Sequence, residues 1–162
     1  TNSKNEPSVR MVLLKGLSKK GFVFYTNLNS PKSNDLKINL KAEMCFYWKS
    51  LQRQIRIFGD INQVSDEEAD TYFNSRPYGS KISAWASDQS KPMNNKSEFL
   101  KKIENFEKKY KDEKNVPRPP HWSGWCLGPT SMEFWLHQDD RAHERLRYNK
   151  IADGWKKEIL YP

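Results

Sequence analysis

Cationic and hydroxyl side chains stand at the ends of several predicted elements, which is where proteins commonly hold phosphate groups. Arg10 and Lys15 flank one apolar run, and Tyr25–Thr26 ends the next predicted strand. Ser30 and Lys32 lie at a predicted helix start, where free backbone N–H groups favour a phosphate. Each group taken alone is more often a surface or capping residue. Together they suggest a pocket for a small phosphorylated ligand better than a groove for a polymer.

A second group of such side chains follows at regular spacing. Tyr72, Arg76 and Ser80 are four residues apart from one to the next. On one continuous helix this spacing would place them on a shared face. Pro77 interrupts the pattern, so we expect the three side chains to converge around a bend instead. An arginine between two hydroxyl groups suits a second phosphate, because the guanidinium can bind it with two parallel hydrogen bonds.

A third cluster combines Arg141, His143 and Arg145. On a strand these alternate residues point to one face. Beside Trp135, a cationic face of this kind would hold an anionic, planar ligand. Histidine also suits proton transfer near neutral pH. The alternative is an exposed, charged strand at the rim of a barrel.

Other chemistries find little support in the sequence. It contains no P-loop, no GxGxxG, no HExxH and no GxSxG motif. The three histidines show no metal-ligand spacing with Cys45 and Cys126, so no metal site is expected. Both cysteines lie in apolar stretches, and we expect buried thiols in a reducing compartment. No run approaches the ~18 apolar residues of a membrane-spanning helix, and we expect no membrane partner.

The charge balance favours anionic partners. The 162 residues carry 28 Lys and Arg against 20 Asp and Glu, a net charge of +8, and 13% of them are aromatic. Such a surplus attracts nucleic acid, anionic lipid or phosphorylated small molecules. Residues 91–118 hold nine basic and five acidic residues, about half of the surplus, and we expect most of these charges to face solvent.

The elements that must position these groups are mostly strands. The predicted strands cover Ser8–Lys15, Gly21–Thr26, Ala42–Trp48, Arg53–Gln63, Trp122–Leu127, Ser131–Leu136, Arg141–Tyr148 and Trp155–Leu160. The predicted helices run from Pro31, after the N-cap Ser30, to about Leu40, from the capping box at Ser65 to Asn74, and over Tyr78–Ala86 and Ser97–Tyr110. Strands separated by short turns favour an antiparallel barrel with peripheral helices over a doubly wound sheet.

In this order, the clusters resemble the pyridoxamine 5′-phosphate oxidase family over nearly the whole chain. The matching stretches are Pro7–Gly16, Gly21–Asn27, Arg53–Gly59, Tyr72–Ser90, Val116–Trp125, Met132–Trp135, Asp140–Tyr148 and Gly154–Pro162. The most specific of them read YFNSRPYGSKISAWASDQS, MEFW and DRAHERLRY.

The resemblance implies a mainly β fold, the antiparallel, Greek-key FMN-binding split barrel. It implies one domain over residues 1–162, without the family's N-terminal strand and arm, which would precede Thr1. It further implies a cytoplasmic homodimer with FMN at the subunit interface. Such an enzyme oxidises pyridoxine or pyridoxamine 5′-phosphate to pyridoxal 5′-phosphate. Hydride passes to the flavin, and O2 reoxidises it and gives H2O2.

The resemblance also assigns roles to individual residues. The cofactor-binding residues are Arg10, Met11, Val12, Leu13, Leu14, Lys15, Tyr25, Thr26, Lys32, Gln54, Gln89, Ser90, Trp135 and Arg145. The substrate-binding residues are Lys15, Tyr72, Arg76, Ser80, Arg141 and His143. Arg141 and His143 are also the candidate catalytic residues, one covering the substrate ring and the other orienting the substrate or moving a proton.

The chain departs from the family pattern at a few positions. Pro31 stands where the family usually has an arginine, Ala142 replaces a larger apolar residue, and Leu136-His137 stands where Gln-Gly is common. A flavin- or pyridoxal-phosphate-binding relative without oxidase activity is therefore the alternative. A basic β-domain that binds nucleic acid is a weaker alternative, because the cations are dispersed and no base-stacking motif is present.

Overall fold

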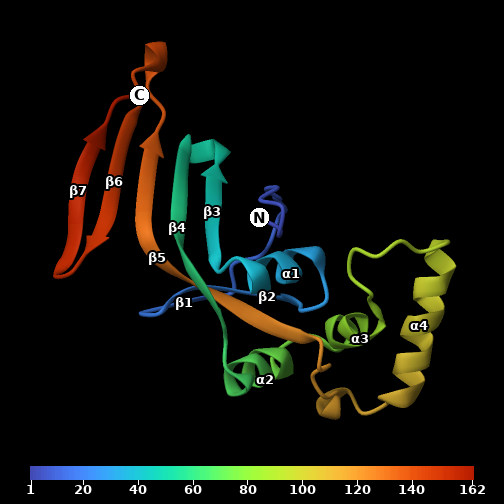
Figure 1. Cartoon of the computed structure of the whole chain (residues 1–162). Helices are drawn as coiled ribbons and strands as arrows, with labels where there is room; N and C mark the ends of the chain where they lie inside the picture. The colour runs from blue at the N-terminus through green and yellow to red at the C-terminus, as the bar shows by residue number, and fades with distance from the viewer. The chain divides into compact units, whose positions relative to one another are not determined.

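The computed structural model describes residues 1–162, and it is built mainly from strands (Figure 1). The strands are β1 (Gly16–Ser18), β2 (Gly21–Asn27), β3 (Lys41–Trp48), β4 (Arg53–Gln63), β5 (Trp122–Leu136), β6 (Glu144–Ile151) and β7 (Gly154–Leu160). The α-helices are α1 (Pro31–Ile38), α2 (Asp66–Asn74), α3 (Tyr78–Ala86) and α4 (Lys96–Lys109). Short 3-10 turns lie at Lys49–Leu51, Glu113–Asn115 and Asp139–Arg141. None of the helices is both long and apolar enough to span a membrane.

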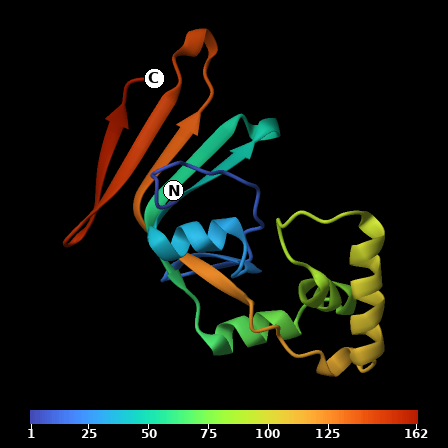
Figure 2. The same ribbon diagram turned by 45° about the vertical axis from the view of Figure 1, so that its right-hand side comes forward.

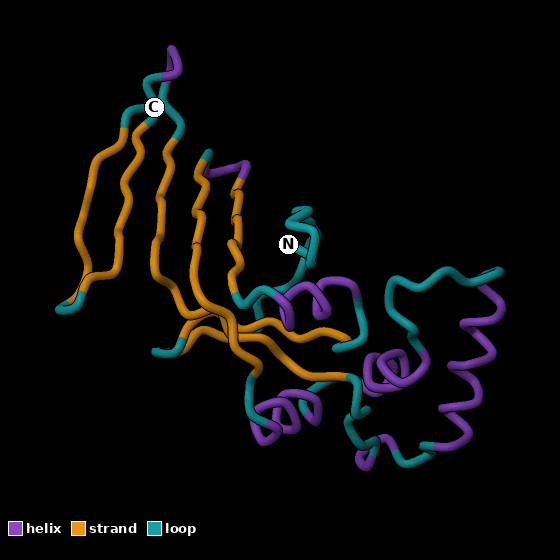
Figure 3. The backbone as a smooth tube through the Cα atoms, viewed as in Figure 1, coloured by secondary structure: helices purple, strands orange, loops and turns teal.

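The strands form one sheet in the order β1-β2-β5-β4-β3, and β6 pairs with both β5 and β7. The pairs β3/β4, β5/β6 and β6/β7 are antiparallel, as the short predicted turns require (Figure 3). In the register of β5 and β6, Trp135 lies opposite Arg145 and Glu133 lies opposite Arg147.

The chain divides into two compact units. The first comprises residues 1–15, 23–39 and 63–125, and the second comprises residues 16–22, 40–62 and 126–162. The expectation of a single domain over residues 1–162 stays a prediction.

The first unit contains helices α2, α3 and α4 (Figure 2). Side chains of these helices pack into a core rich in aromatic residues. Phe73, Ile82, Val116 and Trp122 are buried at its centre, and α4 packs against them through one apolar stripe. Ile103, Phe106 and Tyr110 belong to this stripe, and their spacing of three and four residues is the one that the sequence predicts for an amphipathic helix. The remaining faces of α4 are polar, and none of its residues is fully buried, which confirms a largely solvent-facing charged segment.

Helix boundaries follow the predicted capping signals closely. Ser65 caps α2, and its hydroxyl accepts a hydrogen bond from the backbone N–H of Glu68 (3.2 Å), which is one half of the predicted capping box. Ser30 is the N-cap of α1, and Pro31 occupies its first turn, where a missing N–H costs nothing. That helix ends at Ile38, two residues before the predicted end at Leu40.

The strand predicted over Ser8–Lys15 is wrong. Residues 8–14 form no strand, and only Lys15 at the end of the run is tied to β2, donating its backbone N–H to Val23 O (2.8 Å). Val9 and Met11 are 96% and 95% exposed, so the apolar side chains find no surface to cover. Apolar composition alone does not make a strand, because a strand also needs a paired edge.

Three further predictions need correction. The strand predicted from Arg141 begins only at Glu144, because Asp140 and Arg141 adopt left-handed backbone angles (φ 53° and 62°) that an extended strand excludes. The segments predicted as two strands, Trp122–Leu127 and Ser131–Leu136, form the single strand β5. The thiol of Cys45 is exposed, not buried, and that of Cys126 is partly buried.

Candidate functional site

A cavity of about 860 Å3 lies within the first unit. Most of the residues predicted to bind the cofactor or the substrate phosphate line it. They are Arg10, Met11, Val12, Leu13, Lys15, Tyr25, Thr26, Lys32, Tyr72, Arg76, Ser80, Gln89 and Ser90.

The cavity is built where several elements end. Tyr25 and Thr26 lie at the end of β2, and Lys32 lies in the first turn of α1. Tyr72 is on α2 and Ser80 is on α3, with Arg76 in the connection between the two helices. The chain therefore bends near Pro77, as predicted, and Tyr72, Arg76 and Ser80 line one cavity.

Lys32 is the centre of a hydrogen-bonded group at this cavity. Its Nζ donates to Thr26 Oγ1 (2.7 Å), Gln89 Oε1 (2.8 Å) and Ser30 Oγ (3.1 Å). None of these acceptors carries a charge, so the ammonium has no counter-ion among them. Burial lowers the pKa of Lys32, and the positive charge of Arg10 lowers it further. An anion entering the cavity would relieve both effects.

Arg76 is the second unbalanced cation. Its guanidinium carbon lies 4.8 Å from the centre of the Trp122 ring and 5.5 Å from that of Phe73, a cation–π arrangement. Its Nη1 is buried and has no hydrogen-bond partner. Burial lowers the pKa of Arg76. A buried, unpaired N–H donor is costly, and a ligand oxygen would satisfy it.

An aromatic stack forms one wall. The rings of Tyr25 and Tyr72 lie 4.0 Å apart and nearly parallel, and those of Tyr25 and Trp122 lie 5.2 Å apart. Gly124 permits this packing, because a Cβ atom at that position would come within 2.8 Å of the Tyr25 ring. The stack offers flat apolar surface beside the cationic groups.

The charge balance of the lining is one-sided. Arg10, Lys15, Lys32 and Arg76 contribute four positive side chains, and no aspartate or glutamate lines the cavity. An uncompensated set of this size suits ligands that carry phosphate groups.

Sequence reasoning missed several lining residues. The additional polar and aromatic ones are Asn27, Ser75, Ser83, Ser87, Phe99 and Trp122. A signal for part of this set was present, because Ser80, Ser83 and Ser87 follow at intervals of three and four, the spacing of one helical face. This face of α3 and its C-cap adds hydroxyl groups to the cavity.

A second cavity of about 610 Å3 lies within the second unit. Trp135, His143 and Arg145 line it, together with Arg53 and apolar residues of β5, β6 and β7. The rings of Trp135 and His143 lie 4.7 Å apart. His143 Nδ1 accepts the backbone N–H of Gln138 (3.2 Å), so the neutral imidazole carries its proton on Nε2.

Three predicted site residues line neither cavity. Leu14 lies in the extended N-terminal segment, and Gln54 lies on β4 opposite Tyr47. Arg141 is exposed in the 3-10 turn before β6, and His143 also precedes that strand. Contrary to the sequence prediction, the two residues therefore do not share a strand face with Arg145. The left-handed backbone at Arg141 is the physical reason, because it breaks the alternation of an extended chain.

Comparison with known proteins identifies the family. Residues 1–110 match the family model described as pyridoxamine 5′-phosphate oxidase. Residues 122–162 match the model described as the C-terminal dimerisation region of pyridoxine 5′-phosphate oxidase. The chain belongs to the pyridoxamine 5′-phosphate oxidase family. The predicted family and its enzyme class, an oxidoreductase, are therefore confirmed.

Curated relatives agree with this membership. The pyridoxine/pyridoxamine 5′-phosphate oxidase of Pelagibacter ubique is 57% identical over 100% of this chain and 78% of that protein. The protein of the same name from Chelativorans sp. is 46% identical over 96% of this chain and 75% of that protein.

Solved structures confirm the predicted split-barrel fold. PhzG from Burkholderia lata, in complex with tetrahydrophenazine-1-carboxylic acid, superposes with a TM-score of 0.92 at 28% identity over 100% of this chain and 79% of that chain. A pyridoxamine 5′-phosphate oxidase-related, FMN-binding protein from Nostoc punctiforme has a TM-score of 0.79 at 16% identity, over 99% of this chain and 84% of that chain.

Proposed function

We propose that this chain uses FMN to oxidise pyridoxamine 5′-phosphate or pyridoxine 5′-phosphate to pyridoxal 5′-phosphate, with O2 as the acceptor and H2O2 as the second product. Family membership supports the reaction class. The observation that carries the proposal is the cationic cavity of the first unit. It gathers four positive side chains and no carboxylate at the positions that the family resemblance assigns to two phosphorylated ligands.

The residues present fit FMN. Lys32, with Thr26 and Gln89 around its ammonium, is suited to the cofactor phosphate, and Arg10 adds a second charge nearby. The exposed apolar residues 11–13 offer surface for a flat ring system. When bound, FMN would supply the hydride acceptor, and the residues of this cavity would bind and align the cofactor and the substrate.

The residues also fit the phosphate of the substrate. Arg76 offers a buried, unpaired Nη1, and the neighbouring hydroxyls of Tyr72 and Ser80 add donors at the same cavity. The guanidinium of Arg76 lies over the Trp122 ring, so the cation is oriented before any ligand binds. An arginine restrained in this way loses little conformational entropy when it binds.

His143 is proposed to act on a proton or to orient the substrate. Because its Nδ1 accepts the backbone N–H of Gln138, the free position of the ring is Nε2. The neutral imidazole therefore presents an N–H donor at Nε2. Protonation of Nδ1 would require the contact with the Gln138 N–H to break first. Arg141 is proposed as its partner over the substrate ring.

The proposal includes a homodimer with FMN at the subunit interface. Each subunit would be one split-barrel domain, and the enzyme would work in the cytoplasm. The match of residues 122–162 to a dimerisation region supports the dimer.

A reconstitution experiment tests the proposal. The purified protein is loaded with FMN, and H2O2 and aldehyde formation are followed with each phosphorylated vitamer and with its unphosphorylated counterpart. We expect turnover of at least one phosphorylated vitamer and much weaker turnover without the phosphate. Bound flavin without turnover of either vitamer would instead support the alternative, a flavin- or pyridoxal-phosphate-binding relative without oxidase activity.

A further inference from the structure

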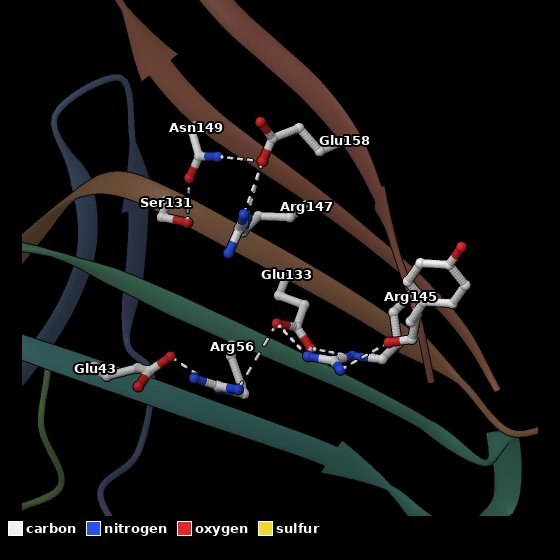
Figure 4. A network of polar contacts seen from close by, with 9 residues as sticks. Glu43, Arg56, Ser131, Glu133, Arg145, Arg147, Asn149 and Glu158 are labelled. Atoms are coloured by element: carbon white, nitrogen blue, oxygen red, sulfur yellow. Dashed lines mark hydrogen bonds and ion pairs between the residues drawn. The ribbon is translucent and has the colours of Figure 1, made fainter. Parts of the chain in front are cut away.

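Arg145 is held by a paired hydrogen bond to Glu133. Its Nε donates to Glu133 Oε1 (3.0 Å) and its Nη2 donates to Glu133 Oε2 (3.1 Å), so the planar guanidinium meets the carboxylate edge to edge (Figure 4). Its Nη1 donates to the backbone oxygen of Tyr161 (3.0 Å). All three nitrogens are engaged, and two of the five N–H donors stay available to a ligand.

Glu133 is itself held in place from its other side. Arg56 Nη1 on β4 lies 3.7 Å from Glu133 Oε2, and Arg56 Nε donates to Glu43 on β3 (2.9 Å). The hydrogen bond to Glu43 raises the pKa of Arg56. The four side chains make a ladder of alternating charge over β3, β4, β5 and β6 (Figure 4). The carboxylate of Glu133 is only 11% exposed, so water competes weakly for its hydrogen bonds.

The position of Glu133 separates its role from that of a ligand-binding residue. Arg145 and Trp135 line the cavity of the second unit, but Glu133, Arg56 and Glu43 do not. Glu133 and Trp135 are alternate residues on β5 and so share a face, and Arg145 lies opposite Trp135 in the register. Glu133 therefore touches a residue of the cavity lining, Arg145, without lining the cavity itself.

We propose that Glu133 is a positioning residue for flavin binding, which fixes the guanidinium of Arg145 in the orientation that contacts the cofactor. This inference rests on the proposed function and its homodimer, because Arg145 is a predicted flavin contact that lines the cavity of the second unit, whereas the proposed site of the cofactor phosphate is the cavity of the first unit. Without Glu133 the side chain of Arg145 regains rotamer freedom, and its ordering then weakens ligand affinity. Arg56 would also lose one of its two carboxylate neighbours and keep only Glu43.

The test measures the FMN dissociation constant by quenching of flavin fluorescence on titration with flavin-free protein. We expect Glu133→Gln to weaken FMN binding about tenfold, as the loss of one charge-assisted hydrogen-bond pair implies. Glu158→Gln is the matched control. Glu158 on β7 accepts from Arg147 Nη2 (2.8 Å) in the same sheet but lines neither cavity, and its variant should bind FMN within about twofold of the wild type.

A double-mutant cycle separates positioning from a general structural effect. In an Arg145→Lys background, Glu133→Gln should change the FMN dissociation constant by less than about twofold, because the group through which it acts is gone. If Glu133→Gln does not fold, Glu133→Asp replaces it in the double-mutant cycle with Arg145→Lys. This variant keeps the negative charge between Arg56 and Arg145 but shortens the side chain that holds the guanidinium.

Two results with the variants would overturn the inference. Glu133→Gln with the FMN affinity of the wild type contradicts it, and so does an undiminished loss of affinity in the Arg145→Lys background. A wild-type protein that binds no FMN overturns the proposed function first and this inference with it. That outcome is distinguishable, because it is seen before any variant is compared.

Discussion

The guanidinium of Arg76 lies over the ring of Trp122, 4.8 Å from its centre, and keeps one buried nitrogen without a hydrogen-bond partner. A fold does not normally leave a buried donor of this kind unsatisfied. The arrangement makes sense when a ligand oxygen completes it. The proposed site of the substrate phosphate adjoins the aromatic core of the first unit, since Trp122 lines the cavity and is part of that core.

Replacing Arg76 by lysine should therefore weaken substrate binding more than turnover. Lysine keeps the charge but loses the planar, two-pronged donor, and we expect KM for the phosphorylated vitamer to rise about tenfold or more, with a smaller change in kcat. Lys109→Gln is the control, because Lys109 lies over another aromatic ring, 5.7 Å from the centre of Trp85, outside the cavity. Steady-state kinetics give both constants, and an unchanged KM for Arg76→Lys would contradict the assignment.

The lowered pKa of Lys32 predicts a pH-dependent stability in the flavin-free protein. Between that lowered pKa and the ordinary value of 10.5, the unfolded chain binds more protons at this residue than the folded chain does. Stability at this site therefore rises as the pH increases through the window. Thermal unfolding should show that the stability of the wild type increases relative to that of Lys32→Met as the pH rises through this window. Parallel curves would contradict it.

The stack of Tyr25 on Tyr72 and Trp122 depends on Gly124. Gly124→Ala should destabilise the protein by about 1–3 kcal/mol, because the new methyl group forces the Tyr25 ring to move. Gly79→Ala in α3 is the matched control, since a Cβ there meets nothing within 4 Å, and it should be neutral or stabilise the helix by about 0.5–1 kcal/mol. Denaturant unfolding compares the two, and equal effects would refute the steric argument.

His143 and His137 offer a paired test of proton chemistry. Their rings lie 5.1 Å apart, but only His143 lines the cavity of the second unit. We expect His143→Asn to lower kcat about a hundredfold, the size typical of a lost acid–base group. His137→Asn should change kcat by less than about threefold. If both variants lose activity equally, the effect belongs to the local packing and not to His143 Nε2.

Local signals in the sequence predicted much of the first unit. The capping box at Ser65, Pro31 at the start of α1, and the interrupted spacing of Tyr72 and Arg76 each depend on residues close in the chain. Such signals are readable, because their geometry is set within one or two turns. The residues alone predicted two phosphate pockets, but not that both groups line one cavity, because that depends on contacts between elements far apart in the chain.

The failures have a different physical origin. Residues 8–14 are apolar enough for a strand, but strand formation depends on an available edge, which no local pattern reports. Asp140 and Arg141 both adopt left-handed backbone angles. Neither residue is a glycine, so the sequence gives no local signal for this conformation. The pairing of Glu133 with Arg145 was also invisible, since it depends on the register between β5 and β6.

The absence of carboxylates around Lys32 and Arg76 has a consequence for selection among metabolites. A cavity with this field draws in phosphate monoesters of every kind and speeds their encounter with the protein, more so at low ionic strength. Charge alone cannot tell a sugar phosphate from a pyridine phosphate. Discrimination must therefore come from the groups proposed to contact the ring of the ligand, since flat apolar and aromatic surface favours an aromatic ligand over a saturated one.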